Sequence, residues 1–190
     1  MAGQITPLDL SRFFEQHSTL ETERLILREV TVGDAGDLFA YFGDPETTLY
    51  VSHTAHKIVQ RTEEVLSRAP KYFAERDSIR FAIERKSDGK VMGIFDLHSF
   101  SPQNHRMELG YGLAKAYWGF GYMTEAVREV IRFAFDEMGM HRIEAECETG
   151  NLRSIRVAER CGMTLEATRV ENEVNKGRFV SNHVYAIVRQ

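Results

Sequence analysis

Several features are missing from this sequence, and each absence excludes a class of protein. No stretch approaches the ~20 consecutive apolar residues that cross a bilayer, and residues 1–4 have neither the basic segment nor the apolar core of a secretion signal. We therefore expect a cytoplasmic protein with no membrane partner. Internal repeats and low-complexity segments are also absent, so the 190 residues, 43% of them hydrophobic, suit one compact α/β domain.

Cysteines are few, and the chain has no excess of positive charge. Cys147 and Cys161 stand inside apolar patterns rather than at metal-ligand spacing, so we expect buried free thiols and no metal site. The sequence positions no His or cation to lower the pKa of either thiol, so neither is expected to act as a nucleophile. The formal net charge is −4 at pH 7, whereas binding to nucleic acid needs a basic face. No nucleic-acid partner is expected, and a cationic substrate would suit the acidic balance.

One glycine-containing stretch joins a strand pattern to a helix pattern. Residues 107–113 alternate large apolar residues with Glu or Gly, and residues 123–138 repeat apolar residues at intervals of three and four. The turn between them is Trp118-Gly119-Phe120-Gly121-Tyr122. Unpaired N–H groups and the positive end of the helix dipole would favour a phosphate there, and glycines let it approach closely. Glycines also serve merely to turn the chain, so this signal alone is weak.

Two familiar phosphate-binding loops do not match this turn. No Gly-Lys-Ser/Thr follows, which excludes a Walker loop, and the third glycine of the dinucleotide fingerprint is missing.

The rest of the chain alternates further strand and helix patterns. Strands are expected within 20–30, 79–84, 91–98, 106–113, 141–148, 163–173 and 179–188. Helices are expected over 35–42, 57–75, 123–138 and 151–162, with Pro70 bending or splitting the second. Residues 1–19 are interpreted as an N-terminal helical appendage, with a short amphipathic helix over 7–17.

The helix over 151–162 carries a second polar motif. Asn151 stands at its N-cap position and Gly162 where it should stop. Ser154 lies one helical turn from Asn151, so both side chains can reach the same ligand.

Together these motifs resemble the GNAT superfamily of acyl-CoA-dependent N-acetyltransferases, over nearly everything from Leu20 to Val188. The similar segments are Thr-Glu-Arg-Leu-Ile-Leu-Arg, Glu-Leu-Gly-Tyr, Trp-Gly-Phe-Gly-Tyr with Thr-Glu-Ala, and Asn-x-x-Ser ending in Cys-Gly-Met. The closest branch acetylates N-termini of ribosomal proteins. The resemblance implies an α/β (α+β) fold over residues 20–190: a mixed, mostly antiparallel sheet of about six or seven strands flanked by about four or five helices. It also implies a splay between the strand of Glu108 and that of Ile143.

The resemblance further implies acetyl-CoA as co-substrate. The family's Gln/Arg-x-x-Gly-x-Gly/Ala loop maps onto residues 118–123, with Trp118 and Met123 departing from the usual residue types. The pyrophosphate would lie on N–H groups of residues 119–124, pantetheine would pair with the strand at 111–113, and Arg153, Arg156 or Arg160 could meet the 3′-phosphate or simply be solvated. The implied binding set is Tyr111, Leu113, Trp118, Gly119, Phe120, Gly121, Tyr122, Met123, Thr124, Asn151, Ser154 and Arg156.

Direct transfer to an amine in a ternary complex needs a base, an oxyanion donor and a proton for the leaving thiolate. Glu108 is the predicted base, acting directly or through water, because strand alternation places it on the face of Gly110 and Gly112. Much of the superfamily has a proton-donating Tyr seven residues after the Asn, where this chain has Ala158. Ser154, or a water it holds, is the predicted replacement, and a backbone N–H within 109–111 is the predicted oxyanion donor.

The acceptor stays open among several classes. An α-amine, with a pKa of about 8 against about 10.4 for lysine, is far more often neutral at pH 7, which favours a protein N-terminus and, by resemblance, a ribosomal protein. The alternatives are a small amine (a polyamine, an amino acid or an aminoglycoside) and a CoA-binding module without turnover. Tyr50, His53 and His183 could line an acceptor pocket or be structural. The last two strands could also form the edge of a homodimer.

Overall fold

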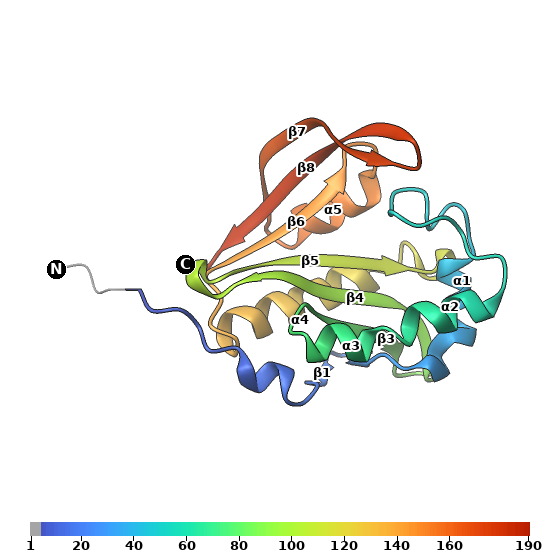
Figure 1. Ribbon diagram of the computed structural model, residues 1–190, viewed down its shortest axis with the longest axis horizontal. Helices are drawn as coiled ribbons and strands as arrows, with labels where there is room; N and C mark the ends of the chain where they lie inside the picture. The colour runs from blue at the N-terminus through green and yellow to red at the C-terminus, as the bar shows by residue number, and fades with distance from the viewer. Residues whose placement is uncertain (1–4) are drawn as a thin grey trace.

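One eight-stranded sheet runs through the computed structural model, which describes residues 5–190 (Figure 1). The strand order is β1-β2-β3-β4-β5-β6-β8-β7, and every neighbouring pair is antiparallel except β5 and β6. The bounds are β1 (Leu20–Glu21), β2 (Leu25–Glu29), β3 (Ser78–Arg85), β4 (Lys90–Ser101), β5 (Arg106–Leu113), β6 (Arg142–Glu148), β7 (Thr164–Asn175) and β8 (Arg178–Val188). The mixed, mostly antiparallel class is confirmed.

The sheet has more strands than predicted because the segment 20–30 is a hairpin rather than one strand. Leu20 pairs with Leu27, so the chain reverses between β1 and β2. Thr22 closes the reversal: its N–H donates to the Leu25 carbonyl at 3.0 Å, and its hydroxyl accepts from the Leu25 N–H at 2.9 Å. The alternation of apolar residues does not reveal a side-chain-to-backbone hydrogen bond of this kind, so the reversal could not be predicted from it.

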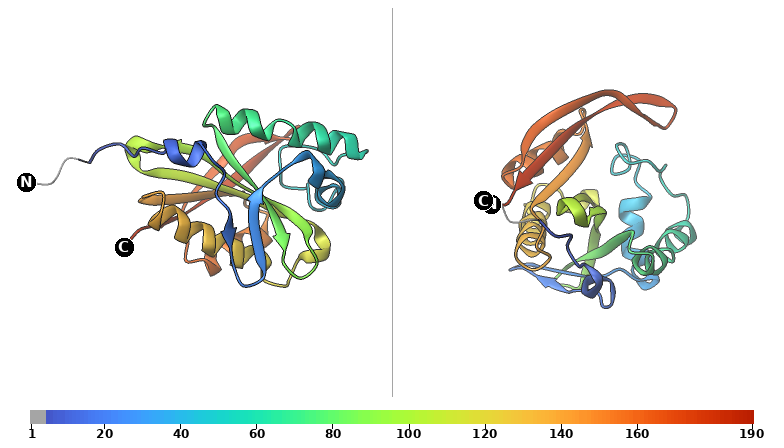
Figure 2. Two further views of the ribbon diagram at one scale, coloured as in Figure 1. Left: turned by 90° about the horizontal axis from the view of Figure 1, so that it is seen from below. Right: turned by 60° about the vertical axis from the view of Figure 1, so that its left-hand side comes forward.

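Helices cover both faces of the sheet (Figure 2). Their bounds are α1 (Ala35–Phe42), α2 (Val59–Leu66), α3 (Ala69–Ala74), α4 (Tyr122–Asp136) and α5 (Leu152–Arg160). The predicted split of the 57–75 helix is confirmed, since Pro70 stands in the first turn of α3, where its missing N–H costs nothing. The main core lies between the sheet and α4, whereas α1 and α2 pack on the other face around Leu38 and Phe42.

The predicted helix over residues 7–17 is wrong in extent. A short 3₁₀ helix, η1 (Ser11–Phe14), is present, and the Leu8 N–H donates to the carbonyl of Pro102 instead of starting a helix. Leu10 and Phe13 are each 7% exposed and belong to the main core. The domain boundary at residue 20 stays a prediction. Among residues 5–190, no helix is both long and apolar enough to cross a bilayer.

The predicted splay lies between β5 and β6. These parallel strands pair only over Arg106–Arg142, Met107–Ile143 and Glu108–Glu144. Beyond Glu108 they part, and β6 with β8 swings away from β5 in Figure 1. The outer half of β5 therefore presents backbone groups that β6 does not pair.

Candidate functional site

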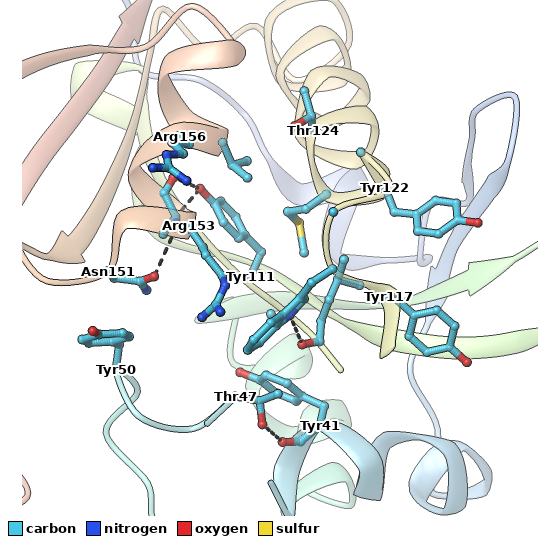
Figure 3. A pocket seen from close by; sticks show the side chains of 18 of the residues that line it. Tyr41, Thr47, Tyr50, Tyr111, Tyr117, Tyr122, Thr124, Asn151, Arg153 and Arg156 are labelled. Atoms are coloured by element: carbon cyan, nitrogen blue, oxygen red, sulfur yellow. Dashed lines mark hydrogen bonds between the residues drawn. The ribbon is translucent and has the colours of Figure 1, made fainter. Parts of the chain in front are cut away.

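A cavity of about 430 Å³ lies where β5 and β6 have parted (Figure 3). Its walls are the end of β5, the turn into α4, the first turns of α5 and the loop after α1. All residues of the predicted binding set except Phe120 line it: Tyr111, Leu113, Trp118, Gly119, Gly121, Tyr122, Met123, Thr124, Asn151, Ser154 and Arg156. The fold thus brings two sequence-distant motifs to one cavity.

Two predicted site residues lie outside this cavity wall. The Phe120 side chain is 63% exposed. Its backbone is held in place, because the Phe120 carbonyl accepts a hydrogen bond from Arg24 Nη1 at 3.0 Å. Glu108 lies on the opposite face of β5 from Tyr111, with His98 Nδ1 4.0 Å from its Oε2. Glu108 stands at the last β5–β6 pair, where the splay begins.

The turn into α4 has the geometry of an anion-binding loop. Gly119 and Gly121 have φ of 85° and 81°, in the left-handed region that favours glycine. The N–H groups of residues 121–124 make no hydrogen bond within the described chain. They stand at the positive end of the 15-residue helix α4. Free N–H groups beside an open cavity fit a phosphate or pyrophosphate.

Glu125 anchors this turn to the β1–β2 hairpin. Its Oε1 accepts from the Thr22 hydroxyl at 2.5 Å and the Arg24 N–H at 2.9 Å, and Oε2 accepts from Arg24 Nε at 2.6 Å. Burial disfavours the charge, yet these hydrogen bonds lower the pKa of Glu125 overall. The sequence interpretation gave Thr22, Arg24 and Glu125 no role, although all three belong to the motifs that carried the resemblance.

The first turn of α5 contacts the Tyr111 hydroxyl in the cavity wall (Figure 3). Asn151 caps the helix as predicted, because its Oδ1 accepts from the Ser154 N–H at 3.3 Å. The Ser154 hydroxyl donates to Tyr111 Oη at 3.3 Å. Burial raises the pKa of Tyr111, and the hydrogen bond with Ser154 opposes that shift in part. The sequence interpretation used only the backbone of Tyr111, so this pairing of hydroxyls is new.

The opposite wall comes from the end of α1 and the irregular loop that follows it, where the sequence analysis named Tyr50 as a possible acceptor-pocket residue. Tyr41, Glu46, Thr47, Tyr50 and Val51 line the cavity from this side. Glu46 accepts from Lys115 and, at 3.2 Å, from Arg153. The Arg153 guanidinium lies 4.1 Å from the Trp118 ring centroid. The loop, α5 and the turn into α4 are thus linked around the cavity.

A second, smaller cavity of about 120 Å³ adjoins the first through Tyr50, which lines both. Its other wall residues are Ser52, Glu146, Cys147, Glu148, Glu173, Asn175 and Asn182. The sequence analysis gave none of the three glutamates a role. Their side chains come from β6 and β7, beyond the splay.

The remaining candidates fall elsewhere. His53 packs with Phe42 and His56, and burial lowers its pKa. His183 Nδ1 bonds to the Thr168 hydroxyl at 2.9 Å. Of the three predicted acceptor-pocket residues, Tyr50 alone lines a cavity described above.

Both cysteines are buried free thiols, as predicted. Burial raises the pKa of Cys147 to about 11 and also raises that of Cys161, so neither thiol is activated as a nucleophile. Within the described part of the chain, no three His, Cys, Asp or Glu side chains gather as metal ligands.

The family description "Acetyltransferase (GNAT) domain" matches residues 24–164. The chain belongs to the GNAT acetyltransferase family. It is 31% identical over 172 residues to the uncharacterised N-acetyltransferase p20 of Bacillus licheniformis, which covers 90% of this chain and 97% of that protein. The resemblance stated from the sequence is confirmed at the level of the family.

Solved GNAT structures share the fold. A GCN5-related N-acetyltransferase from Brucella melitensis superposes with a TM-score of 0.85 and 25% identity, covering 97% of this chain and 82% of that one. The ribosomal L7/L12 α-N-protein acetyltransferase RimL, solved with coenzyme A, gives a TM-score of 0.79 at 16% identity, covering 90% of this chain and 98% of that one. The second likeness shows the fold alone.

Proposed function

We propose that this GNAT protein transfers an acetyl group from acetyl-CoA to the N-terminal α-amine of a protein, with ribosomal proteins as the first acceptors to test. One observation carries the proposal: the free N–H groups of residues 121–124 and the Ser154–Tyr111 pair line the same cavity. The first group suits a pyrophosphate and the second a departing thiolate.

Bound acetyl-CoA would supply a thioester carbonyl that an amine can attack. The N–H groups of residues 121–124 would hold the pyrophosphate. Asn151 uses its Oδ1 as a cap, which leaves its Nδ2 group to donate to a pantetheine carbonyl. The backbone of β5 beyond Glu108 is not paired by β6. It would form hydrogen bonds with the pantetheine arm in the way that neighbouring strands of a sheet do. Arg153, Arg156 and Arg160 line the cavity and would meet the remaining phosphate.

Ser154 and Glu108 would move the protons. A C–N bond forms as the C–S bond breaks, so the amine must lose a proton and the sulfur must gain one. Ser154 would donate to the sulfur by turning its hydroxyl proton away from Tyr111 Oη, which accepts that proton in this structure. Glu108 lies outside the cavity wall, at the start of the splay, so we assign it the base role through an intervening water.

An N-terminal acceptor is supported by the chemistry of the amine. An α-amine has a pKa of about 8, so a sizeable fraction is neutral at pH 7 and little is demanded of the base. A relative with the same fold is described as a ribosomal L7/L12 α-N-protein acetyltransferase. A small-molecule amine is the second candidate, because the cavity beyond Tyr50 is only about 120 Å³.

The test follows release of free thiol from acetyl-CoA in the presence of N-terminal peptides and small amines, with mass spectrometry locating the acetyl group. Acetylation of a peptide α-amine well above the rate without acceptor supports the proposal. Acetylation of small amines alone supports the second candidate. Bound acetyl-CoA with no transfer to any acceptor would indicate a CoA-binding module instead.

A further inference from the structure

The small cavity beyond Tyr50 lies on the polar side of the splay. On β6, Ile143 and Ala145 point to the main core, so Glu146 and Glu148 point to the opposite face of the sheet, which Glu108 shares. Glu173 and Asn175 reach the cavity from β7, and Asn182 from β8. The walls contain three carboxylates, and no Lys or Arg of the described chain lines them.

Asn175 provides an observation independent of the acidic residues. It is 5% exposed and lines the cavity. Its Nδ2 donates to Glu148 Oε1 at 2.5 Å, which fixes the orientation of the amide, because a carboxylate accepts only from the nitrogen. Its Oδ1 is buried and has no hydrogen-bond partner among residues 5–190. Buried acceptors are rarely left unpaired, so this oxygen points to a missing donor.

The negative charges of the three glutamates are balanced to different degrees by nearby cations. Glu148 Oε2 accepts from Arg178 Nη2 at 2.6 Å, and Glu146 forms an ion pair with Arg169. Glu173 Oε2 accepts from Asn182 Nδ2 at 2.9 Å, and no described cation lies within ion-pair distance of it. Burial raises the pKa of Glu146, with the charges of Glu108 and Glu144 adding and that of Arg169 opposing. The cavity thus has surplus acceptors and surplus negative charge.

An ammonium group has the matching chemistry, because it carries three donors, one positive charge and no acceptor. We propose that the small cavity binds a second ammonium group of the acceptor, beyond the amine that receives the acetyl group. The proposal rests on the acetyl transfer proposed above and narrows its acceptor to a dication. A free diamine, or a protein N-terminus followed by lysine, would supply this group.

The reacting amine itself suits this cavity poorly. Neighbouring carboxylates favour the protonated form of an amine, and a protonated amine has no lone pair to attack a carbonyl. The nucleophile would instead lie on the Ser154 side of Tyr50, while the second ammonium holds the acceptor from the other side.

Calorimetry on the full chain saturated with CoA tests the proposal without turnover. The probes are 1,4-diaminobutane against n-butylamine, and a peptide beginning Ser-Lys against one beginning Ser-norleucine. We expect at least one dication to bind about tenfold more tightly than its matched monocation. Glu173→Gln should remove most of that preference and leave the monocation unchanged. Glu173 is an exposed residue, so the variant should fold, and Glu171→Gln on the same strand is the matched control.

Which probe shows the preference identifies the source of the ammonium group. Equal affinity for dication and monocation in both pairs, or an equal loss for both in Glu173→Gln, would overturn the proposal. Failure of the proposed function has a different signature, because a dication would still bind in a Glu173-dependent way while no acetyl transfer occurred.

Discussion

Ser154 Oγ lies 3.3 Å from Tyr111 Oη in the wall of the cavity that forms where β5 and β6 part. The two hydroxyls come from different elements, α5 and β5. Ala158 stands at the position where the resemblance to the superfamily implies a proton-donating Tyr. This hydroxyl pair is the proposed proton source for the departing thiolate, and the raised pKa of Tyr111 keeps its phenol protonated.

Removing the Ser154 hydroxyl should slow transfer without weakening cofactor binding. We expect Ser154→Ala to lower kcat about 100-fold, the lower end for loss of a general acid, because water can replace it in part. KM for acetyl-CoA should change little. Steady-state kinetics measures both, with Ser87→Ala in the exposed β3–β4 turn as the control. An unchanged kcat would assign the proton transfer elsewhere.

Glu108→Gln should give a loss that depends on pH. At pH 7 about nine-tenths of an amine with a pKa of about 8 is protonated, so we expect kcat/KM to fall by up to about tenfold without the base. The deficit should shrink as pH rises through the amine pKa of about 8, since the free amine then needs no base. Measuring the pH profile with Glu64→Gln, an exposed residue of α2, as control checks this. A deficit that is constant with pH would indicate a structural role.

Two of the left-handed glycines allow a matched comparison. Gly121 and Gly177 have φ of 81° and 79°, so replacement by Ala strains each by about 1–2 kcal/mol. Gly121 lies at the start of α4, in the cavity wall, whereas Gly177 lies in the β7–β8 turn. Both variants should lose similar stability, but Gly121→Ala alone should raise KM for acetyl-CoA. Equal KM in both would argue against phosphate binding at this turn.

The Glu125 anchor should make stability depend on pH. Its folded pKa is lowered from 4.5, so its stabilisation is present above about pH 4.5 and is lost as pH falls through the folded pKa. We expect Glu125→Gln to cost about 2 kcal/mol at pH 7, with the gap to wild type narrowing below about pH 4.5. Urea unfolding at several pH values measures the gap. A gap that is independent of pH would mean that the carboxylate charge contributes nothing.

The fold and the cofactor end of the site were predictable because they depend on local signals. The glycine turn before α4 and the Asn151 cap are short-range motifs whose geometry follows from backbone chemistry. The hairpin between β1 and β2 was missed because a side chain, Thr22, closes it. Its partner Glu125 lies about a hundred residues away in sequence, and only tertiary structure brings them together.

The small cavity proposed to bind the acceptor was not predictable for the same reason. Glu146, Glu173 and Asn175 come from two strands that are separated in the chain, and each alone has the pattern of a solvated strand residue. Glu108 was found by alternation, which gives the face of the strand but not its distance from the cavity. The pairing of Tyr111 with Ser154 likewise depends on how α5 sits over the splay.

The most direct test of the account is thiol release from acetyl-CoA with N-terminal peptides as acceptors, followed by mass spectrometry of the peptide. The account predicts release well above the rate without peptide, one acetyl group on the α-amine, and a fall of about 100-fold in Ser154→Ala. No transfer to any peptide or small amine, although acetyl-CoA binds, would contradict it.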